Sequence, residues 1–344
     1  MREELLSPDQ EPPEVEVEAG LRPRSLEEFV GQDELKGHLR VMLAAARERE
    51  QASDHFLFAG PPGLGKTTLA HIVANEMEAE LHVTSGPALE RAGDLAAILT
   101  KLEPGDVLFI DEIHRLSRVV EEVLYPAMED FELDIILGKG PAARSIRLEL
   151  PNFTLVGATT RTGLITGPLR DRFGLTARLD YYEPEDLRAI VERAANILGV
   201  QIDSDGASEI AGRSRGTPRI GNRLLRQVRD FAQIERPESK GHIDLDIAND
   251  GLAFFGVDSL GLDKPTRAIL DSLCTRFNGG PVGLKTLSIS VSEPEDTVED
   301  VYEPFLIQQG LLLRTPKGRV ATPTAFTHLG LAPPRNSAGS LFDE

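Results

Sequence analysis

The chain has 344 residues, of which 40% are hydrophobic and 27% charged, a balance typical of a soluble globular protein with two or three domains. It contains no apolar run long enough for a membrane-spanning helix, and its acidic N-terminus lacks the apolar core of a secretory signal. The single cysteine, Cys274, excludes an intramolecular disulfide framework and suits a reducing cytoplasm. The formal net charge of −19 argues against a surface that attracts DNA generally, so contact with DNA would need a local basic patch or a partner protein.

The first 20 residues carry seven carboxylates against one basic side chain, together with three prolines. This composition predicts a disordered, solvated tail. Residues 21–32 then lead into an amphipathic helix, which we expect from Asp33 to about Arg49.

The stretch Gly60-Pro-Pro-Gly-Leu-Gly-Lys-Thr-Thr68 matches the phosphate-loop pattern G-x-x-x-x-G-K-[ST]. An apolar strand pattern over 56–59 precedes it, and helical spacing over 69–77 follows. Backbone amides in such a loop bind phosphate oxygens, and the helix N-terminus adds partial positive charge. We expect Lys66 to reach the β- and γ-phosphates of a bound nucleoside triphosphate, and the Thr67 hydroxyl to bind Mg²⁺.

Two carboxylates, Asp111 and Glu112, follow the apolar run over 107–110. In a buried parallel strand they would reach the carboxyl edge of the sheet, where ligands bind in doubly wound folds. Asp111 would then hold the Mg²⁺ shell, and Glu112 would act as general base on the attacking water. Taken alone, the pair could also be surface carboxylates at a turn, but its position after a phosphate loop favours nucleotide hydrolysis.

A second buried strand is expected from Phe153 and ends in Thr159 and Thr160, either of which could orient the attacking water. The turn at 168–173 carries Arg170 and Arg172, which the pattern alone assigns to a solvated ion-pair face. Arg219 follows a proline at a helix start, where it could point toward the nucleotide or simply face water.

Residues 132–150 alternate around a glycine turn at 138–140 and predict a β-hairpin with an apolar tip. The hairpin could pack on its own domain or dock a partner protein. The apolar residues in question are Ile135, Ile136, Leu137 and Ile146.

The C-terminal half changes character twice. Helical patterns extend from Pro184 to Phe255, and three further helices with a β-ribbon follow, which together predict a winged helix. Arg314, Lys317 and Arg319 cluster on the ribbon and could contact DNA, the alternative being a solvated hairpin.

The predicted fold is therefore α/β, with a parallel P-loop sheet covered by helices on both faces, followed by a small helical domain and a winged helix. The expected boundaries are an acidic tail over 1–20, the nucleotide-binding domain over 21–183, the helical domain over 184–256, the winged helix over 257–332 and a disordered tail over 333–344.

Taken in order, five motifs resemble those of AAA+ ATPases. They are 60–68, Phe109-Ile-Asp-Glu-Ile-His-Arg-Leu116, Gly157-Ala-Thr-Thr-Arg161, Pro168-Leu-Arg-Asp-Arg-Phe173 and Gly216-Thr-Pro-Arg219. The entry Leu21-Arg-Pro23 and the ribbon 313–319 narrow the resemblance to the RuvB family of bacterial Holliday junction branch migration ATPases, and it extends from about Leu21 to Leu329.

The resemblance implies roles for further residues. Arg172 matches the arginine finger that acts on the neighbouring subunit's nucleotide, with Arg170 the weaker candidate, while Thr160 and Arg219 match the two sensors. Arg314 and Arg319 match DNA-contacting arginines, and the hairpin matches the element that docks RuvA. The implied ATP-binding residues are Leu21, Arg22, Gly63, Gly65, Lys66, Thr67, Thr68, Glu129, Asp130, Phe131, Arg172, Tyr182 and Arg219.

It also implies a cytoplasmic hexameric ring that uses ATP and Mg²⁺ to pull duplex DNA, working with a RuvA tetramer on the junction and with the RuvC resolvase, and with no membrane. Such a ring needs few basic residues facing its bore, which reconciles DNA movement with an acidic chain. The alternatives are another AAA+ machine, such as a clamp loader or protein remodeller, and a nucleotide-switched DNA-binding regulator that barely hydrolyses ATP.

Overall fold

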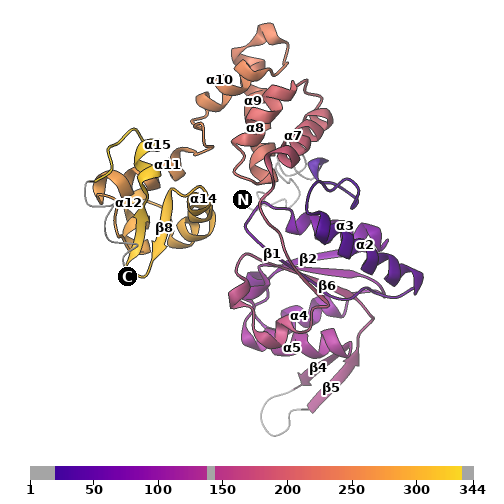
Figure 1. The fold of residues 1–344 in the computed structure, drawn as a ribbon. Coiled ribbons are helices and arrows are strands. Elements are labelled where there is room, and N and C mark those ends of the chain that lie inside the picture. The colour runs from indigo at the N-terminus through magenta and orange to yellow at the C-terminus, as the bar shows by residue number, and fades with distance from the viewer. Residues whose placement is uncertain (1–19, 138–143, 335–344) are drawn as a thin grey trace, which may run out of the picture. The chain divides into compact units, whose positions relative to one another are not determined.

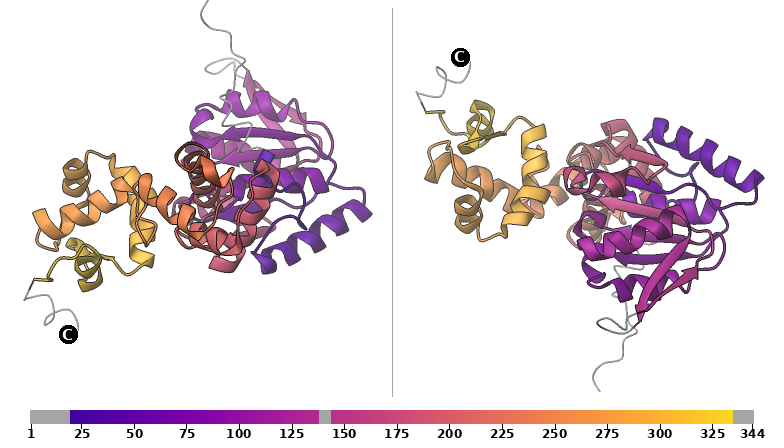
Figure 2. Two further views of the ribbon diagram at one scale, coloured as in Figure 1. Left: turned by 90° about the horizontal axis from the view of Figure 1, so that it is seen from above. Right: turned by 90° about the horizontal axis from the view of Figure 1, so that it is seen from below.

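The computed structural model describes residues 20–137 and 144–334, so the predicted tails and the hairpin's glycine turn lie outside the described residues. The described chain divides into two compact units (Figures 1 and 2). The first comprises 20–60, 65–180 and 193–199, and the second comprises 61–64, 181–192 and 200–334.

A five-stranded parallel sheet forms the centre of the first unit, with strand order β2-β3-β6-β1-β7. The inner strands β1, β3 and β6 are almost entirely buried because helices cover both faces, as their continuous apolar sequences predict. The strands are β1 (Phe56–Ala59), β2 (Leu81–Ser85), β3 (Val107–Asp111), β6 (Thr154–Thr159) and β7 (Leu175–Arg178).

Helices α4 and α5 cover one face of this sheet and α3 the other (Figure 1). The first face is closed by a continuous apolar cluster in which Leu95, Leu99 and Leu124 are fully buried. The α/β prediction is thus confirmed. The helices of this unit are α2 (Asp33–Glu48), α3 (Lys66–Glu76), α4 (Ala92–Leu99), α5 (Arg118–Glu129) and α6 (Gly167–Arg170), with short 3₁₀ turns at Gly86–Ala88, Ile113–Arg115 and Thr162–Leu164.

Strand β7 was not expected from the sequence. Its four residues alternate between half-buried and exposed, because it lies at the edge of the sheet. A strand this short gives too few alternations to stand out from a loop.

The predicted hairpin is present as β4 (Glu132–Leu137) paired antiparallel with β5 (Arg144–Glu149). Ile135 lies opposite Ile146 in this pairing.

The second unit begins with helices, as predicted, and ends in the predicted winged helix. Fully buried Leu273, Leu287 and Leu306 join the winged helix into one core. Its helices are α11 (Lys264–Asp271), which continues as a π-helical turn at Ser272–Arg276, α12 (Leu284–Val291), α13 (Glu295–Thr297), a second π turn at Val298–Tyr302, α14 (Glu303–Gln308) and α15 (Pro323–His328), and its ribbon pairs β8 (Leu312–Thr315) with β9 (Gly318–Ala321).

The preceding helices of this unit pack through the amphipathic α9, whose buried positions include Leu224, Val228 and Phe231. They are α7 (Pro184–Leu198), which contributes residues to both units, α8 (Ser204–Gly212), α9 (Pro218–Glu235) and α10 (Leu245–Phe254). No helix among the described residues is long and apolar enough to cross a membrane.

Candidate functional site

The loop between β1 and α3 has a backbone shape that depends on glycine. Gly60 and Gly63 have φ angles of 144° and 84°, which L side chains rarely adopt. A Cβ at Gly60 would lie 2.6 Å from the Leu179 carbonyl oxygen, and one at Gly63 would lie 3.1 Å from the Arg219 Cβ. The loop can therefore follow this course without strain only because these positions lack side chains.

Lys66 and Thr67 form the first turn of α3, directly after this loop. The Lys66 side chain is buried, and its Nζ donates a 2.7 Å hydrogen bond to the Gly60 carbonyl. The ammonium group thus folds back across the loop. A buried cation and the N-terminus of an eleven-residue helix both favour an anion at this position.

The carboxylates Asp111 and Glu112 lie at the carboxyl end of β3, as predicted. Glu112 has a positive φ of 47°, an uncommon conformation for a residue with a side chain, and one that turns the chain sharply after the strand. Its Oε2 accepts hydrogen bonds from the Thr160 hydroxyl at 3.1 Å and from the Thr160 amide at 3.3 Å. The structure therefore brings together the predicted general base and one of the two predicted threonines.

The other threonine, Thr159, is fully buried and points at a different partner. Its hydroxyl lies 2.9 Å from His114 Nδ1, which also lies 3.1 Å from Glu112 Oε2. The role of His114 was not predicted from the sequence. Its position three residues after Asp111 was a signal, because the 3₁₀ turn over Ile113–Arg115 returns the ring to the strand end.

Thr67 and Asp111 offer a hydroxyl and a carboxylate, the oxygen ligands that Mg²⁺ prefers. Among residues 20–137 and 144–334, no group of three or more histidine, cysteine, aspartate or glutamate side chains could hold a metal ion. Two protein oxygens fit a cation that completes its shell with phosphate oxygens and water, as Mg²⁺ usually does.

Within the second unit, the loop residues 61–64 contact the turn that begins α9. The Arg219 amide donates to the Gly63 carbonyl at 3.4 Å, and the Tyr182 hydroxyl donates to the Leu64 carbonyl at 3.3 Å. Burial raises the pKa of Tyr182, so its hydroxyl keeps its proton and remains a donor. Two predicted ATP-binding residues, Arg219 and Tyr182, therefore lie beside the loop.

Leu21 and Arg22, also predicted to bind ATP, lie in the first unit. Leu21 is buried, and its carbonyl accepts a 2.8 Å bond from Arg193. The Arg22 guanidinium lies 3.4 Å from the ring of His71 on α3, the helix that follows the phosphate loop.

The two candidate arginine fingers have different surroundings. Arg170 is exposed beside Asp171. Arg172 lies with its guanidinium carbon 4.4 Å from the ring centre of Tyr125 and donates a 2.9 Å bond to Glu129. It lines a pocket of about 480 Å³ together with Glu129 and Phe131, both of which the family resemblance assigns to the nucleotide.

The basic cluster on the winged-helix ribbon is less uniform than the sequence indicated. Arg314 and Lys317 are exposed, although Arg314 pairs with Glu299. Arg319 is 8% exposed, and its guanidinium donates to both carboxylate oxygens of buried Glu303, at 2.6 and 3.1 Å. Arg319 lies opposite Arg314 in the ribbon and so on the same face, but it differs from Arg314 and Lys317 in being buried, because its side chain packs against α14 and pairs there with Glu303.

The hairpin presents exposed apolar side chains at Ile146 and Leu148. The side chains of Ile135, Ile136 and Leu137, also predicted to dock a partner, lie outside the described residues, as does the turn over 138–143. Exposed isoleucine and leucine side chains at one place are typical of a protein-binding surface.

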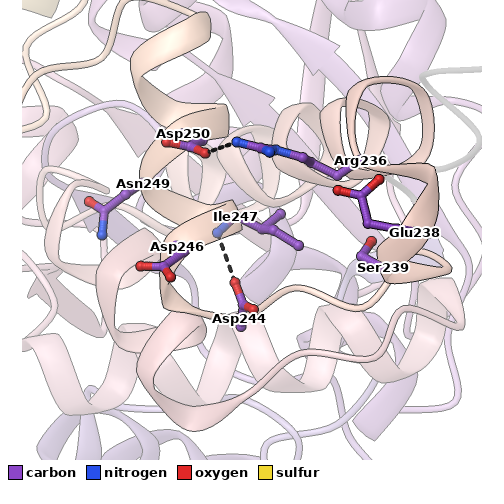
Figure 3. A pocket seen from close by; sticks show the side chains of 8 residues that line it. All are labelled: Arg236, Glu238, Ser239, Asp244, Asp246, Ile247, Asn249 and Asp250. Atoms are coloured by element: carbon purple, nitrogen blue, oxygen red, sulfur yellow. Dashed lines mark hydrogen bonds and ion pairs between the residues drawn. The ribbon is translucent and has the colours of Figure 1, made fainter.

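A second pocket, of about 500 Å³, lies among α9, α10 and the turn between them (Figure 3). Its charge is mainly negative, and Asp244 and Asp250 are already engaged with the Ile247 amide and with Arg236. Carboxylates repel phosphate, so this pocket is not a nucleotide site. Its lining residues are Arg236, Glu238, Ser239, Asp244, Asp246, Ile247, Asn249 and Asp250.

A glycine-dependent phosphate loop at the end of β1, with an Asp-Glu pair and a threonine at the ends of β3 and β6, defines a P-loop nucleoside triphosphatase. Helical and winged-helix segments follow the ATPase sheet. Residues 21–179 match the Holliday junction DNA helicase RuvB P-loop domain, 182–258 the RuvB AAA lid domain, and 259–330 the RuvB C-terminal winged helix domain. The chain belongs to the RuvB family of P-loop ATPases.

Similar proteins cover nearly the whole chain. The Holliday junction branch migration complex subunit RuvB of Parafrankia sp. (strain EAN1pec) is 58% identical over 337 residues, which are 98% of this chain and 95% of that protein. RuvB of Rubrobacter xylanophilus is 62% identical over 317 residues, 92% of this chain and 88% of that protein. The solved Thermotoga maritima RuvB Holliday junction branch migration motor superposes with a TM-score of 0.83 at 48% identity, covering 92% of this chain and all of that one.

Proposed function

We propose that this chain is an ATP-driven DNA translocase that moves Holliday junction branch points in recombination and repair. The observation that supports the proposal most is the 3.1 Å contact between Glu112 and Thr160 at the ends of β3 and β6, because a carboxylate held there would suit the general base that hydrolysis requires. The similar proteins named above are branch migration subunits by name, which supports the choice of DNA junctions as the substrate.

In this proposal the phosphate loop binds ATP, with Lys66 turning from the Gly60 carbonyl to the phosphates. Thr67 and Asp111 would hold Mg²⁺, which neutralises phosphate charge when bound. Glu112 takes a proton from the attacking water, and Thr160 holds the Glu112 carboxylate in place. The remaining nucleotide contacts in the proposal come from Gly63, Gly65, Thr68, Leu21, Arg22, Tyr182 and Arg219.

Arg172 would complete the site of the next subunit in a hexameric ring, together with Glu129, Asp130 and Phe131. Its place beside a polar pocket, in contrast to the exposed Arg170, supports that choice. Hydrolysis would then require assembly, because no protomer alone supplies both the general base and the arginine to one nucleotide.

The winged helix would contact duplex DNA through Arg314 and Lys317 on its ribbon. The helical segment that leads into α14 carries exposed Glu295 and Asp296, so phosphates would repel it and it is unsuited to the major groove. Sequence-independent contact through the ribbon suits a motor that must move along any DNA.

The proposed partners are a RuvA tetramer that holds the junction and docks the exposed hairpin, and the RuvC resolvase, all in the cytoplasm. Recruitment by RuvA would explain how a chain with a net charge of −19 reaches DNA. If four-way junction DNA with RuvA failed to raise the ATPase rate, the assignment to branch migration would be lost.

Mixed rings test the shared site. Arg172→Ala subunits keep their own general base, and Glu112→Gln subunits keep their arginine, so each is expected to hydrolyse ATP poorly alone. Mixing them should restore turnover, because a Glu112→Gln subunit can supply Arg172 to an Arg172→Ala neighbour. Arginines supplied in trans are worth about 10³–10⁵-fold in related phosphoryl transfers, so the recovery should be large. Failure to recover would refute a role in trans.

A further inference from the structure

The helix before the candidate finger supplies an aromatic platform beneath it. Tyr125 lies in α5, and its ring centre is 4.4 Å from the Arg172 guanidinium carbon. A guanidinium over an aromatic ring is attracted by the ring's negative face, and the flat contact restricts the orientation of a long, flexible side chain.

The Tyr125 ring is itself held in place. Its hydroxyl donates a 2.9 Å bond to Glu121, one turn earlier in α5, and Glu121 is only 4% exposed. Burial of the tyrosine raises its pKa, and the Glu121 carboxylate adds to this effect, so the hydroxyl remains a donor at neutral pH.

The same carboxylate also anchors the short helix that precedes Arg172. The Thr166 hydroxyl donates to Glu121 Oε2 at 3.0 Å, and Thr166 is the N-cap of α6. The carbonyl of Pro168 in α6 in turn accepts a 2.6 Å bond from Arg172. Glu121 thus fixes two groups to α5: the Tyr125 ring beneath the guanidinium, and the α6 turn that precedes Arg172.

We propose that Tyr125, held by Glu121 and Thr166, is a positioning residue that presents Arg172 to the neighbouring subunit's nucleotide. The inference rests on the proposed role of Arg172 in trans. Tyr125 itself would touch neither the nucleotide nor the attacking water, so its effect would appear only in the subunit that donates the arginine.

This asymmetry separates positioning from general damage to the fold. In the mixture of Arg172→Ala with Glu112→Gln subunits, Tyr125→Leu is placed either in the donor, which carries Glu112→Gln, or in the acceptor, which carries Arg172→Ala. In the donor it should lower the restored kcat about tenfold, the rate equivalent of a partly desolvated cation–π contact, with KM for ATP unchanged. In the acceptor, whose finger is already absent, it should leave the restored rate unchanged.

Two further variants refine the test. Tyr125→Phe keeps the ring and loses the hydroxyl bond, so the donor should retain activity within about threefold. Val119→Ala lies in the same helix at an exposed position and serves as the matched control, with no expected effect in either subunit.

The outcomes are distinguishable. Equal losses in donor and acceptor would overturn positioning in favour of a folding defect, and no loss in the donor would overturn it as well. If the parent mixture shows no recovery, Arg172 does not act in trans, and both the proposed shared site and the role of Tyr125 fall. Recovery in the parent mixture with no donor effect of Tyr125→Leu would leave the shared site standing and refute only the role of Tyr125.

Discussion

Replacing Arg319 should destabilise the winged helix rather than simply weaken its DNA contacts. Glu303 is 1% exposed, and its carboxylate accepts two hydrogen bonds from the Arg319 guanidinium. Arg319→Ala would leave that carboxylate buried without its cation. Removing one partner of a buried ion pair costs about 3–5 kcal/mol, a large share of the roughly 4–10 kcal/mol expected for a domain of this size.

Hydrogen exchange in the full-length chain measures this cost locally, which matters because a chain with several domains does not unfold in one step. At about 1.4 kcal/mol per factor of ten, amide protection in β8, β9 and α14 should fall by roughly 10²–10³-fold or more. Amides of the ATPase sheet should keep their protection and provide an internal reference.

The double variant Arg319→Met with Glu303→Met is the control. It removes both charges and keeps apolar volume, and such replacements of buried ion pairs are often neutral or stabilising. Protection should therefore recover toward the parent level. Unchanged protection in Arg319→Ala, or equal losses in the single and double variants, would refute the argument that an orphaned carboxylate causes the damage.

The exposed ribbon residues should behave differently: Arg314→Ala and Lys317→Ala should each weaken duplex binding and reduce the slope of log K against log salt by about one. Arg276→Ala, whose guanidinium donates to the Ser290 carbonyl and does not belong to the ribbon, should leave the slope unchanged. Salt slopes identical to the parent's would mean that Arg314 and Lys317 face solvent and do not contact DNA. Burial lowers the pKa of His55 below its usual 6.5, and the ring's Nδ1 accepts a hydrogen bond from the Leu155 amide. The folded ATPase unit therefore favours the neutral form of His55. The unfolded chain then binds more protons, so stability should be full above about pH 6.5 and fall as the pH drops below it; His55→Asn should flatten that dependence in thermal melts between pH 5 and 8, and an unflattened profile would exclude His55 as its source.

Much of the nucleotide site could be predicted from the sequence because its signals are local. The phosphate loop needs glycine, lysine and threonine at set spacing, and an apolar run that ends in Asp111 and Glu112 places both at the edge where parallel strands end. The same rule brings the end of β6 to that edge, but the strand patterns left Thr159 and Thr160 as alternatives, and the contact of Thr160 with Glu112 came from the structure. The ribbon and helices of the winged helix follow from equally local periodicities.

The tertiary structure alone decided the surroundings of each arginine. Arg170 and Arg172 are two residues apart, but only Arg172 meets Tyr125 and Glu129, because α5 packs beside the turn that carries it. The basic ribbon residues look alike in sequence, and only the packing of α14 against the ribbon shows that Arg319 is buried with Glu303. These pairs are separated by 16 to 47 positions in the chain, so no local pattern records them. Local spacing determines which chemical groups reach the edge of the sheet. Long-range packing determines which side chains are buried, which form ion pairs with distant residues, and which stay exposed to solvent.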